Sequence, residues 1–422
     1  MEKPQPAYRS ELFVNHVEEI AMVTQAVQAA MARKAKRTRA ITFYGERGSG
    51  KTWLTRHLGA TLPTRIETAS QDVAPYSSPV QVLTLFLAPP KVELDEDAQR
   101  KCADCLFFGA PSLPASQSAS EIMNAILRWV CEKWDVTHDA NASASDLIYW
   151  LGRDLPRRPN VAFVLIVDSV FEFGKGNERL PLLEDMLLAP IATLENGLVI
   201  MTGRGAPFPW RSVPLRHEHV EVVLPPFQSQ DVGEQLARCA VTADPIRTVR
   251  ICELGGGYPL NNYVLGQSDP PEAGLDELVN VLLDFVEHDN LSVREALEAL
   301  CVLDRFRERE IATMVARQRT PSNATELTME DARRVRDLLL ENYLMRWQVE
   351  GYVINESVRV AYRSYLRYRK PSFYAAMMDH AISIYRAWSE QYPKARDHYR
   401  RQAEQLALLP APNGVPAPSI MR

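Results

Sequence analysis

The stretch Gly45-Glu46-Arg47-Gly48-Ser49-Gly50-Lys51-Thr52 follows the pattern Gly-x-x-x-x-Gly-Lys-Ser/Thr. The β-branched and aromatic residues at 41–44 predict a short buried strand before it, and residues 51–60 predict an amphipathic helix after it. A strand, a glycine-rich turn and a helix N-terminus form the context in which this pattern binds phosphate. The glycines let successive N–H groups point into one concavity, and the helix dipole adds positive potential there.

The main chain of four loop residues is expected to cradle the phosphates: Gly45, Gly48, Ser49 and Gly50. Lys51 is expected to reach the β- and γ-phosphates, and the Thr52 hydroxyl to ligate Mg²⁺. A glycine turn without a ligand is the alternative interpretation. The predicted strand and helix on either side favour the phosphate site.

Two further apolar runs end in polar residues that suit the same chemistry. Residues 161–168 are almost continuously apolar, which is typical of a central parallel strand, and they end in Asp168. Ligands of doubly wound sheets bind at the carboxyl ends of the strands, so Asp168 is expected to hold Mg²⁺ as a Walker B acid. Residues 198–202 predict another strand, and Arg204 beyond it is expected to contact a γ-phosphate. The competing interpretations are that Asp168 caps a turn and that Arg204 is an ordinary surface arginine.

The composition is that of an ordinary globular protein, with 46% hydrophobic and 24% charged residues. The length of 422 residues predicts two to four domains, and the net charge of −5 argues against wholesale binding to nucleic acid. No apolar run approaches the roughly 20 residues of a membrane-spanning helix, and the first residues lack an apolar signal core. We therefore expect a cytoplasmic protein without a membrane partner.

The six cysteines are scattered along the chain, which fits a reducing compartment. Cys102 and Cys105 have C-x-x-C spacing, but no second pair of zinc ligands lies near them in the sequence. Residues 88–120 contain several prolines and an acidic cluster, and they predict an inserted loop. We expect Cys102 and Cys105 to be free thiols in this loop.

Changes of pattern along the chain predict an α/β domain with a parallel sheet, followed by mostly helical parts. Three helical patterns precede two short strands at 343–349 and 352–354, which together predict a winged helix. The basic stretch over 33–39 is expected to be a solvated helix end rather than a nucleic-acid contact. The expected parts are a phosphate-loop NTPase domain (1–228), a helical domain (229–290), a winged helix (291–370), a helical extension (371–408) and a disordered tail (409–422).

The order of these motifs resembles the STAND class of P-loop NTPases, which contains the NB-ARC ATPases. The resemblance covers roughly residues 11–368. Beyond the phosphate loop, the similar stretches are Phe13-Val14-Asn15-His16, Asp168-Ser169-Val170-Phe171, Val199-Ile200-Met201-Thr202-Gly203-Arg204, Leu224-Pro225-Pro226-Phe227, Gly256-Gly257-Tyr258-Pro259-Leu260 and Tyr352-Val353-Ile354-Asn355. Four positions depart from the family pattern: Asn15 and His16 replace Gly and Arg, Ser169 replaces a second acid, and Asn355 replaces a histidine.

The resemblance implies that the protein binds ATP or ADP with Mg²⁺. It implies that Phe13 and Val14 pack on the adenine, that Pro259 contacts the base and sugar side of ADP, and that Asn355 donates a hydrogen bond to the β-phosphate. Arg204 would act as the γ-phosphate sensor. The missing second acid at Ser169 implies slow hydrolysis.

The resemblance also implies a switch that is closed around ADP and opens and oligomerises with ATP. No effector and no repeat sensor is visible in the sequence, so we expect an effector or trigger protein on another chain. A DNA-binding winged-helix ATPase, related to AAA+ initiators or transcription regulators, is the second hypothesis. Its basis is a group of basic residues near the winged helix: Arg359, Arg363, Arg367, Arg369 and Lys370. A metabolic kinase or transporter ATPase is the third hypothesis. The sequence leaves open whether the nucleotide is ATP or GTP.

Overall fold

The computed structural model describes residues 8–69, 79–87, 104–107, 117–173, 179–204, 209–284, 286, 290–319 and 327–408. The chain forms two compact units. The first contains Met1–Gly45 and Gly50–Pro225, and the second contains Glu46–Ser49 and Pro226–Arg422. Four loop residues therefore group with the second unit, although they lie between segments of the first.

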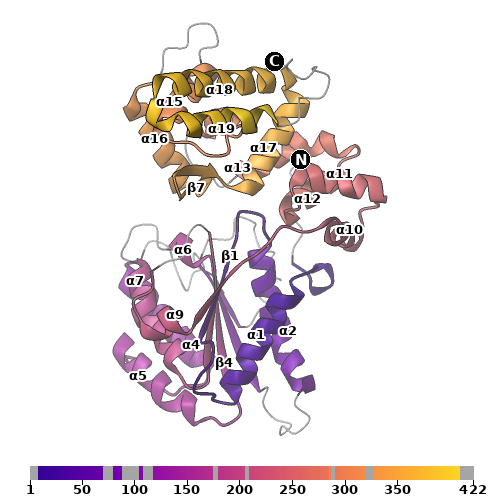
Figure 1. The fold of residues 1–422 in the computed structure, drawn as a ribbon. Helices are drawn as coiled ribbons and strands as arrows, with labels where there is room; N and C mark the ends of the chain where they lie inside the picture. Colours follow the sequence, from indigo (N-terminus) through magenta and orange to yellow (C-terminus); the bar gives the residue numbers. More distant parts are fainter. Residues whose placement is uncertain are drawn as a thin grey trace. The chain divides into compact units, whose positions relative to one another are not determined.

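The first unit is built on a six-stranded parallel sheet with the order β3-β2-β4-β5-β1-β6 (Figure 1). The expected α/β fold with a parallel sheet is confirmed. The strands are β1 (Ala40–Tyr44), β2 (Val80–Phe86), β3 (Cys105–Phe107), β4 (Ala162–Asp168), β5 (Gly197–Gly203) and β6 (His219–Val223).

Helices cover both faces of this sheet (Figure 1). The residues of β4 alternate between two apolar cores, with Phe163, Leu165 and Val167 in one and Ala162, Val164 and Ile166 in the other. This burial on both sides explains the continuous apolar run, because neither face of the strand meets water. The helices of this unit are α1 (Val17–Met31), α2 (Lys51–Ala69), α4 (Ala119–Lys133), α5 (Ala144–Asp154), α6 (Val170–Phe173), α7 (Arg179–Leu183), α8 (Ala189–Thr193) and α9 (Val213–His217), with the 3₁₀ turns η1 (Ser10–Leu12) and η2 (Leu155–Arg157).

Residues 179–193 are helical throughout, with the π-helical turn η3 (Glu184–Leu188) between α7 and α8. One expectation for this unit needs correction. The segment expected as an inserted loop contains β3, which pairs with the end of β2 and adds an edge strand to the sheet. A strand of three residues is too short to show a period-2 pattern in the sequence.

The cysteine expectation is also corrected. Cys105, the first residue of β3, is disulfide-bonded, so the expectation of a free thiol is wrong for it. Cys102 lies outside the described residues, as do 88–103 and 108–116 of the expected loop. Cys131, Cys239, Cys252 and Cys301 are free.

The basic stretch before β1 is structural. Arg37 is only 7% exposed, and its guanidinium donates hydrogen bonds to the main-chain oxygens of Leu194 (2.6 Å) and Gly197 (2.8 Å). Arg39 donates to the oxygens of Ala192, Thr193 and Leu194. The last carbonyls of a helix lack partners within it, and here the two arginines supply them for α8. The expected solvated helix end is therefore wrong for Arg37 and Arg39.

The second unit is mostly helical (Figure 1). Its elements are α10 (Ser229–Arg238), α11 (Pro245–Gly255), α12 (Pro259–Gly266), η4 (Pro271–Gly274), α13 (Leu275–Leu283), α14 (Asn290–Leu300), α15 (Glu308–Arg319), α16 (Met329–Glu341), β7 (Met345–Gln348), β8 (Gly351–Ile354), α17 (Glu356–Arg369), α18 (Pro371–Gln391), η5 (Pro393–Ala395) and α19 (Arg396–Ala407). Helices α14 to α16 precede the antiparallel ribbon β7-β8, which is the arrangement of a winged helix. The expected tail over 409–422 lies outside the described residues.

Candidate functional site

The phosphate loop joins β1 to α2. Gly48 and Gly50 have φ values of +77° and +90°, in the left-handed region that favours glycine. A Cβ atom on Gly48 would lie 2.7 Å from the Cβ atom of Leu260, so the space also requires glycine there. These two glycines give the loop the curvature that turns main-chain N–H groups inward.

The Lys51 side chain lies back along the loop. It is 9% exposed, and its Nζ atom donates a hydrogen bond to the oxygen of Gly45 (2.7 Å). Lys51 is also the first residue of α2, and Ser49 just before it is fully buried. The ammonium group is thus held next to the first residue of the loop, close to the positive end of α2.

Asp168 meets Thr52 at the carboxyl end of β4. Its side chain is 4% exposed, and its Oδ2 atom accepts a hydrogen bond from the Thr52 hydroxyl (3.0 Å). The sequence places these residues 116 positions apart, and the parallel sheet brings them into contact. The contact directly joins two of the predicted site residues.

These two side chains fit a magnesium ion. Mg²⁺ prefers octahedral oxygen ligands at about 2.1 Å, and adjacent ligands of such an ion lie about 3.0 Å apart. The oxygens of Thr52 and Asp168 have this separation. Mg²⁺ is usually held by one or two protein oxygens together with substrate phosphates and water, so a small protein donor set is what such a site requires.

The sequence analysis missed Thr202 as a partner of Asp168. Its hydroxyl donates a hydrogen bond to Asp168 Oδ1 (2.6 Å) and accepts one from the main-chain N–H of Ser169 (2.9 Å). Thr202 is 1% exposed at the end of β5, next to β4 in the sheet. The hydroxyl therefore fixes the carboxylate so that the other oxygen faces Thr52. The sequence did contain a signal for this contact: a residue with a hydroxyl group stands at the end of the strand that neighbours β4.

Ser169 occupies the position where the family pattern has a second acid. It has a positive φ of 61°, and its hydroxyl donates a hydrogen bond to Asp168 Oδ2 (3.3 Å). The carboxylate thus receives hydroxyl groups from Thr52, Thr202 and Ser169, and a longer hydrogen bond from Thr55 (3.5 Å). A hydroxyl there neither adds charge nor acts as a carboxylate base.

Arg204 directly follows β5, at the same edge of the sheet as Asp168. Its side chain is partly exposed. Gly203 before it lies against the ring of Phe171, where a Cβ atom would be 1.9 Å from a ring carbon. β5 therefore places Arg204 at the carboxyl edge of the sheet. Ligands of such sheets bind at this edge, so an arginine that contacts a γ-phosphate would lie here.

Arg56 is a second residue that the sequence analysis missed. It lies one turn after Thr52 on α2, and its guanidinium carbon lies 5.3 Å from the centre of the Phe86 ring. Phe86 is in register with Asp168. Burial lowers the pKa of Arg56, and the negative charge of Asp168 acts in the opposite direction.

Phe13 and Val14 are buried, at 7% and 5% exposure. The ring of Phe13 is stacked on the imidazole of His57 in α2, with centroids 4.0 Å apart and planes 10° apart. Asn15 and His16 follow with positive φ values of 64° and 61°. The segment before α1 thus packs its aromatic residue on α2, the helix that follows the loop.

Pro259 and Asn355 belong to the second unit. Pro259 is the first residue of α12, and its oxygen accepts a hydrogen bond from Gln235 (2.7 Å). Asn355 is 5% exposed, and its side-chain nitrogen donates a hydrogen bond to the oxygen of Tyr343 (2.5 Å). The amide of Asn355 is therefore engaged with the turn that precedes β7, and it keeps a second N–H group.

Four of the five basic residues behind the DNA hypothesis pair with acidic residues of the chain itself. Arg359 and Arg363 both pair with Asp304, and Lys370 pairs with the buried Glu298 (2.8 Å). Arg369 pairs with Asp276 (2.7 Å). These contacts leave less positive charge for phosphates than the sequence suggested.

No helix in the described ranges is both long and apolar enough to span a membrane.

No protein-family model matches the sequence, and no curated protein is significantly similar to it. Among solved structures, the Walker-type ATPase PABY2304 of Pyrococcus abyssi is similar, with a TM-score of 0.54 and 13% identity over 85% of this chain and 98% of that chain. The ORC2 protein of Aeropyrum pernix in its ADP form has a TM-score of 0.48 and 11% identity, over 89% of this chain and 97% of its own. The ORC1 protein of the same organism, in complex with DNA, has a TM-score of 0.42 and 13% identity, over 86% and 94%. The likeness to PABY2304 shows the fold: an α/β phosphate-loop architecture followed by a helical region.

Proposed function

We propose that the protein binds ATP and ADP with Mg²⁺ in the loop formed by residues 45–52. The contact between Thr52 and Asp168 carries this proposal. The loop curvature at Gly48 and Gly50 and the position of Lys51 support it. In this site, Lys51 would face the β- and γ-phosphates and Asp168 would hold Mg²⁺, which supplies charge neutralisation.

The finer proposal is a nucleotide-dependent switch of the STAND type that hydrolyses ATP slowly. The hydroxyl groups around Asp168 support the slow rate, because Ser169 offers no carboxylate base for the attacking water. The contacts that differ between the two states would be those of Phe13 and Val14 with the adenine and of Pro259 and Asn355 with ADP. Arg204 would contact the γ-phosphate. A ligand shifts such a balance only by its different affinity for the two states. The effector would be a protein on another chain.

Isothermal titration calorimetry tests the binding proposal. We expect the wild-type protein to bind Mg²⁺-ADP or Mg²⁺-ATP, and the Lys51→Ala variant to bind at least about tenfold more weakly, because a charge-assisted contact to phosphate is lost. The exposed Lys34 offers a matched control as Lys34→Ala, which should bind like the wild type. Failure of adenine and guanine nucleotides alike to bind the wild-type protein would refute the proposal.

A further inference from the structure

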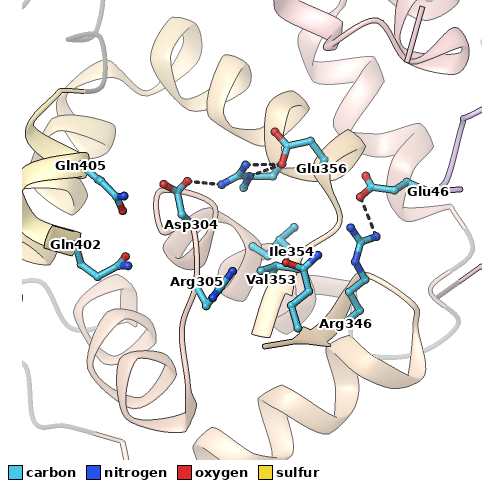
Figure 2. A pocket seen from close by; sticks show the side chains of 11 residues that line it. Glu46, Asp304, Arg305, Arg346, Val353, Ile354, Glu356, Gln402 and Gln405 are labelled. Carbon is cyan, nitrogen blue, oxygen red and sulfur yellow. Dashed lines mark hydrogen bonds and ion pairs between the residues drawn. The ribbon is translucent and has the colours of Figure 1, made fainter. Parts of the chain in front are cut away.

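Glu46, the second residue of the phosphate loop, points away from the loop. Its carboxylate accepts a hydrogen bond from the main-chain N–H of Ser357 (2.5 Å) and pairs with Arg346 (3.1 Å), as Figure 2 shows for the arginine. The side chain is 10% exposed, against 35% for Arg346. All three residues belong to the second unit. The carboxylate is therefore largely withdrawn from water and held at both oxygens.

The two partners come from the winged helix. Arg346 lies on β7, and Ser357 is the second residue of α17, which follows β8. The first N–H groups of a helix lack partners within it and carry partial positive charge, so the N-terminus of α17 suits an anion. In this structure the chain supplies that anion itself, from the loop.

A third contact comes from the residue before Pro259. Burial raises the pKa of the Tyr258 hydroxyl, and the nearby negative charges of Glu46 and Glu356 act in the same direction. The main chain adds to this: the N–H of Leu260 in α12 donates to the oxygen of Gly48 (3.2 Å). Asn261 in turn donates to the oxygen of Ser357 (3.0 Å). The starts of α12 and α17 thus converge on the same loop residues.

The contact has room to open. A cavity of about 430 Å³ adjoins it, lined by Glu46 and Arg346 and, on the far side, by Gln402 and Gln405 of α19 (Figure 2). The cavity leaves space beside the Arg346 side chain, which is 35% exposed.

A carboxylate within a phosphate loop is electrostatically unfavourable for a polyphosphate ligand, because like charges a few ångströms apart repel. Arg346 and the helix N-terminus neutralise this charge while the contact lasts. Once the contact opens, an uncompensated carboxylate remains next to the phosphates. The state of the ribbon and the affinity of the loop are therefore linked, and such linkage is reciprocal.

We propose that Glu46 couples phosphate occupancy of the loop to the winged helix, with Arg346 and the N-terminus of α17 as its latch. While latched, the loop retains nucleotide; when the winged helix moves, Glu46 is released and expels the phosphates. This inference rests on the proposed nucleotide binding and adds the group that regulates it.

Release of a fluorescent ADP analogue, followed by stopped flow, tests the latch. In Arg346→Met the carboxylate loses its cationic partner and keeps only the N-terminus of α17, so its repulsion of the phosphates should speed release by about tenfold. In the double variant Glu46→Gln with Arg346→Met no charge remains to repel, and release should return to within about twofold of the wild type. Restoration by removing the partner is not expected of a merely structural contact.

Arg334 provides a matched control, because it pairs with Glu330 on the exposed face of α16 (2.6 Å), and Arg334→Met should leave release unchanged. Thermal unfolding of each variant shows whether it is folded, and Arg346→Gln is the milder replacement if Arg346→Met is not. Release from Arg346 variants at the wild-type rate, or no slowing in the double variant, would overturn the latch. Absence of binding to the wild-type protein would instead refute the proposed function.

Discussion

At the scale of single residues, the Asp168 carboxylate divides its two oxygens between different tasks. Oδ1 receives the buried Thr202 hydroxyl, and Oδ2 faces Thr52. One oxygen is thus used for orientation and the other is directed to the place where Mg²⁺ would lie. This division predicts different effects for substitutions of Asp168 and of Thr202.

Asp168→Asn removes the charge that would hold Mg²⁺ and keeps the shape of the side chain. We expect ADP without Mg²⁺ to bind within about threefold of the wild type, whereas Mg²⁺-dependent binding of ATP should weaken by about tenfold or more. Calorimetry with Mg²⁺ and with a chelator separates the two effects. The same dependence on Mg²⁺ in both proteins would assign Asp168 a purely structural role.

Thr202→Val removes the hydroxyl that orients Asp168 and leaves a buried carboxylate with one donor fewer. A hydrogen bond to a charged group contributes about 1.5–3 kcal/mol, so Mg²⁺-dependent binding should fall by about tenfold and the melting temperature should also drop. Thr202→Ser keeps the hydroxyl and should restore the Mg²⁺ dependence. If Ser restores nothing, the methyl group and not the hydroxyl is what matters at this position.

At the scale of elements, β6 carries a buried histidine at the edge of the sheet. His219 is hydrogen-bonded to Thr42 of β1 (2.7 Å), and burial lowers its pKa to about 4, while a hydrogen bond that the ring donates to the main chain of Leu215 acts in the opposite direction. The ordinary pKa of histidine is about 6.5. As the pH falls from about 6.5 towards 4, the unfolded chain takes up this proton and the folded chain does not.

The free energy of unfolding should therefore decrease over this pH range, and this part of the decrease should end below about pH 4. His219→Gln can keep the hydrogen bond with Thr42 and cannot titrate, so it should lose less stability between about pH 7 and pH 5. Urea denaturation at the two pH values measures this. An equal loss in the variant and the wild type would show that other groups cause the pH dependence.

The elements also show what the sequence could predict. The run ending in Asp168 was recognisable because a strand buried on both faces is apolar at every position. Lys51, Thr52 and Asp168 could be placed because they lie at fixed offsets from a glycine turn or a strand end. Thr202 and Glu46 escaped notice, because a threonine on a strand and a variable loop residue acquire a role only through contacts across the sheet or with the winged helix. β3 was not predicted, because a strand of three residues is too short to show a period-2 pattern in the sequence.

At the scale of the whole molecule, the proposed switch predicts a change of assembly. With ADP the protein should elute as one species, and with a slowly hydrolysed ATP analogue its molar mass should rise about twofold or more, with or without the expected partner protein. Size-exclusion chromatography with light scattering measures the mass. Lys51→Ala should remain unchanged by either nucleotide. An unaltered monomer in all cases, partners included, would count against the switch.

The place of β1 in the sheet has a consequence for biosynthesis. β1 lies between β5 and β6, so the first strand to leave the ribosome pairs with the last two. The nascent chain must carry this apolar strand without β5 until residue 203 has been synthesised, and without β6 until residue 223. Pairing over such sequence distances is slow, and unpaired edges attract other chains. Ribosome-bound fragments that stop before β5 should therefore depend on chaperones far more than fragments that extend past β6.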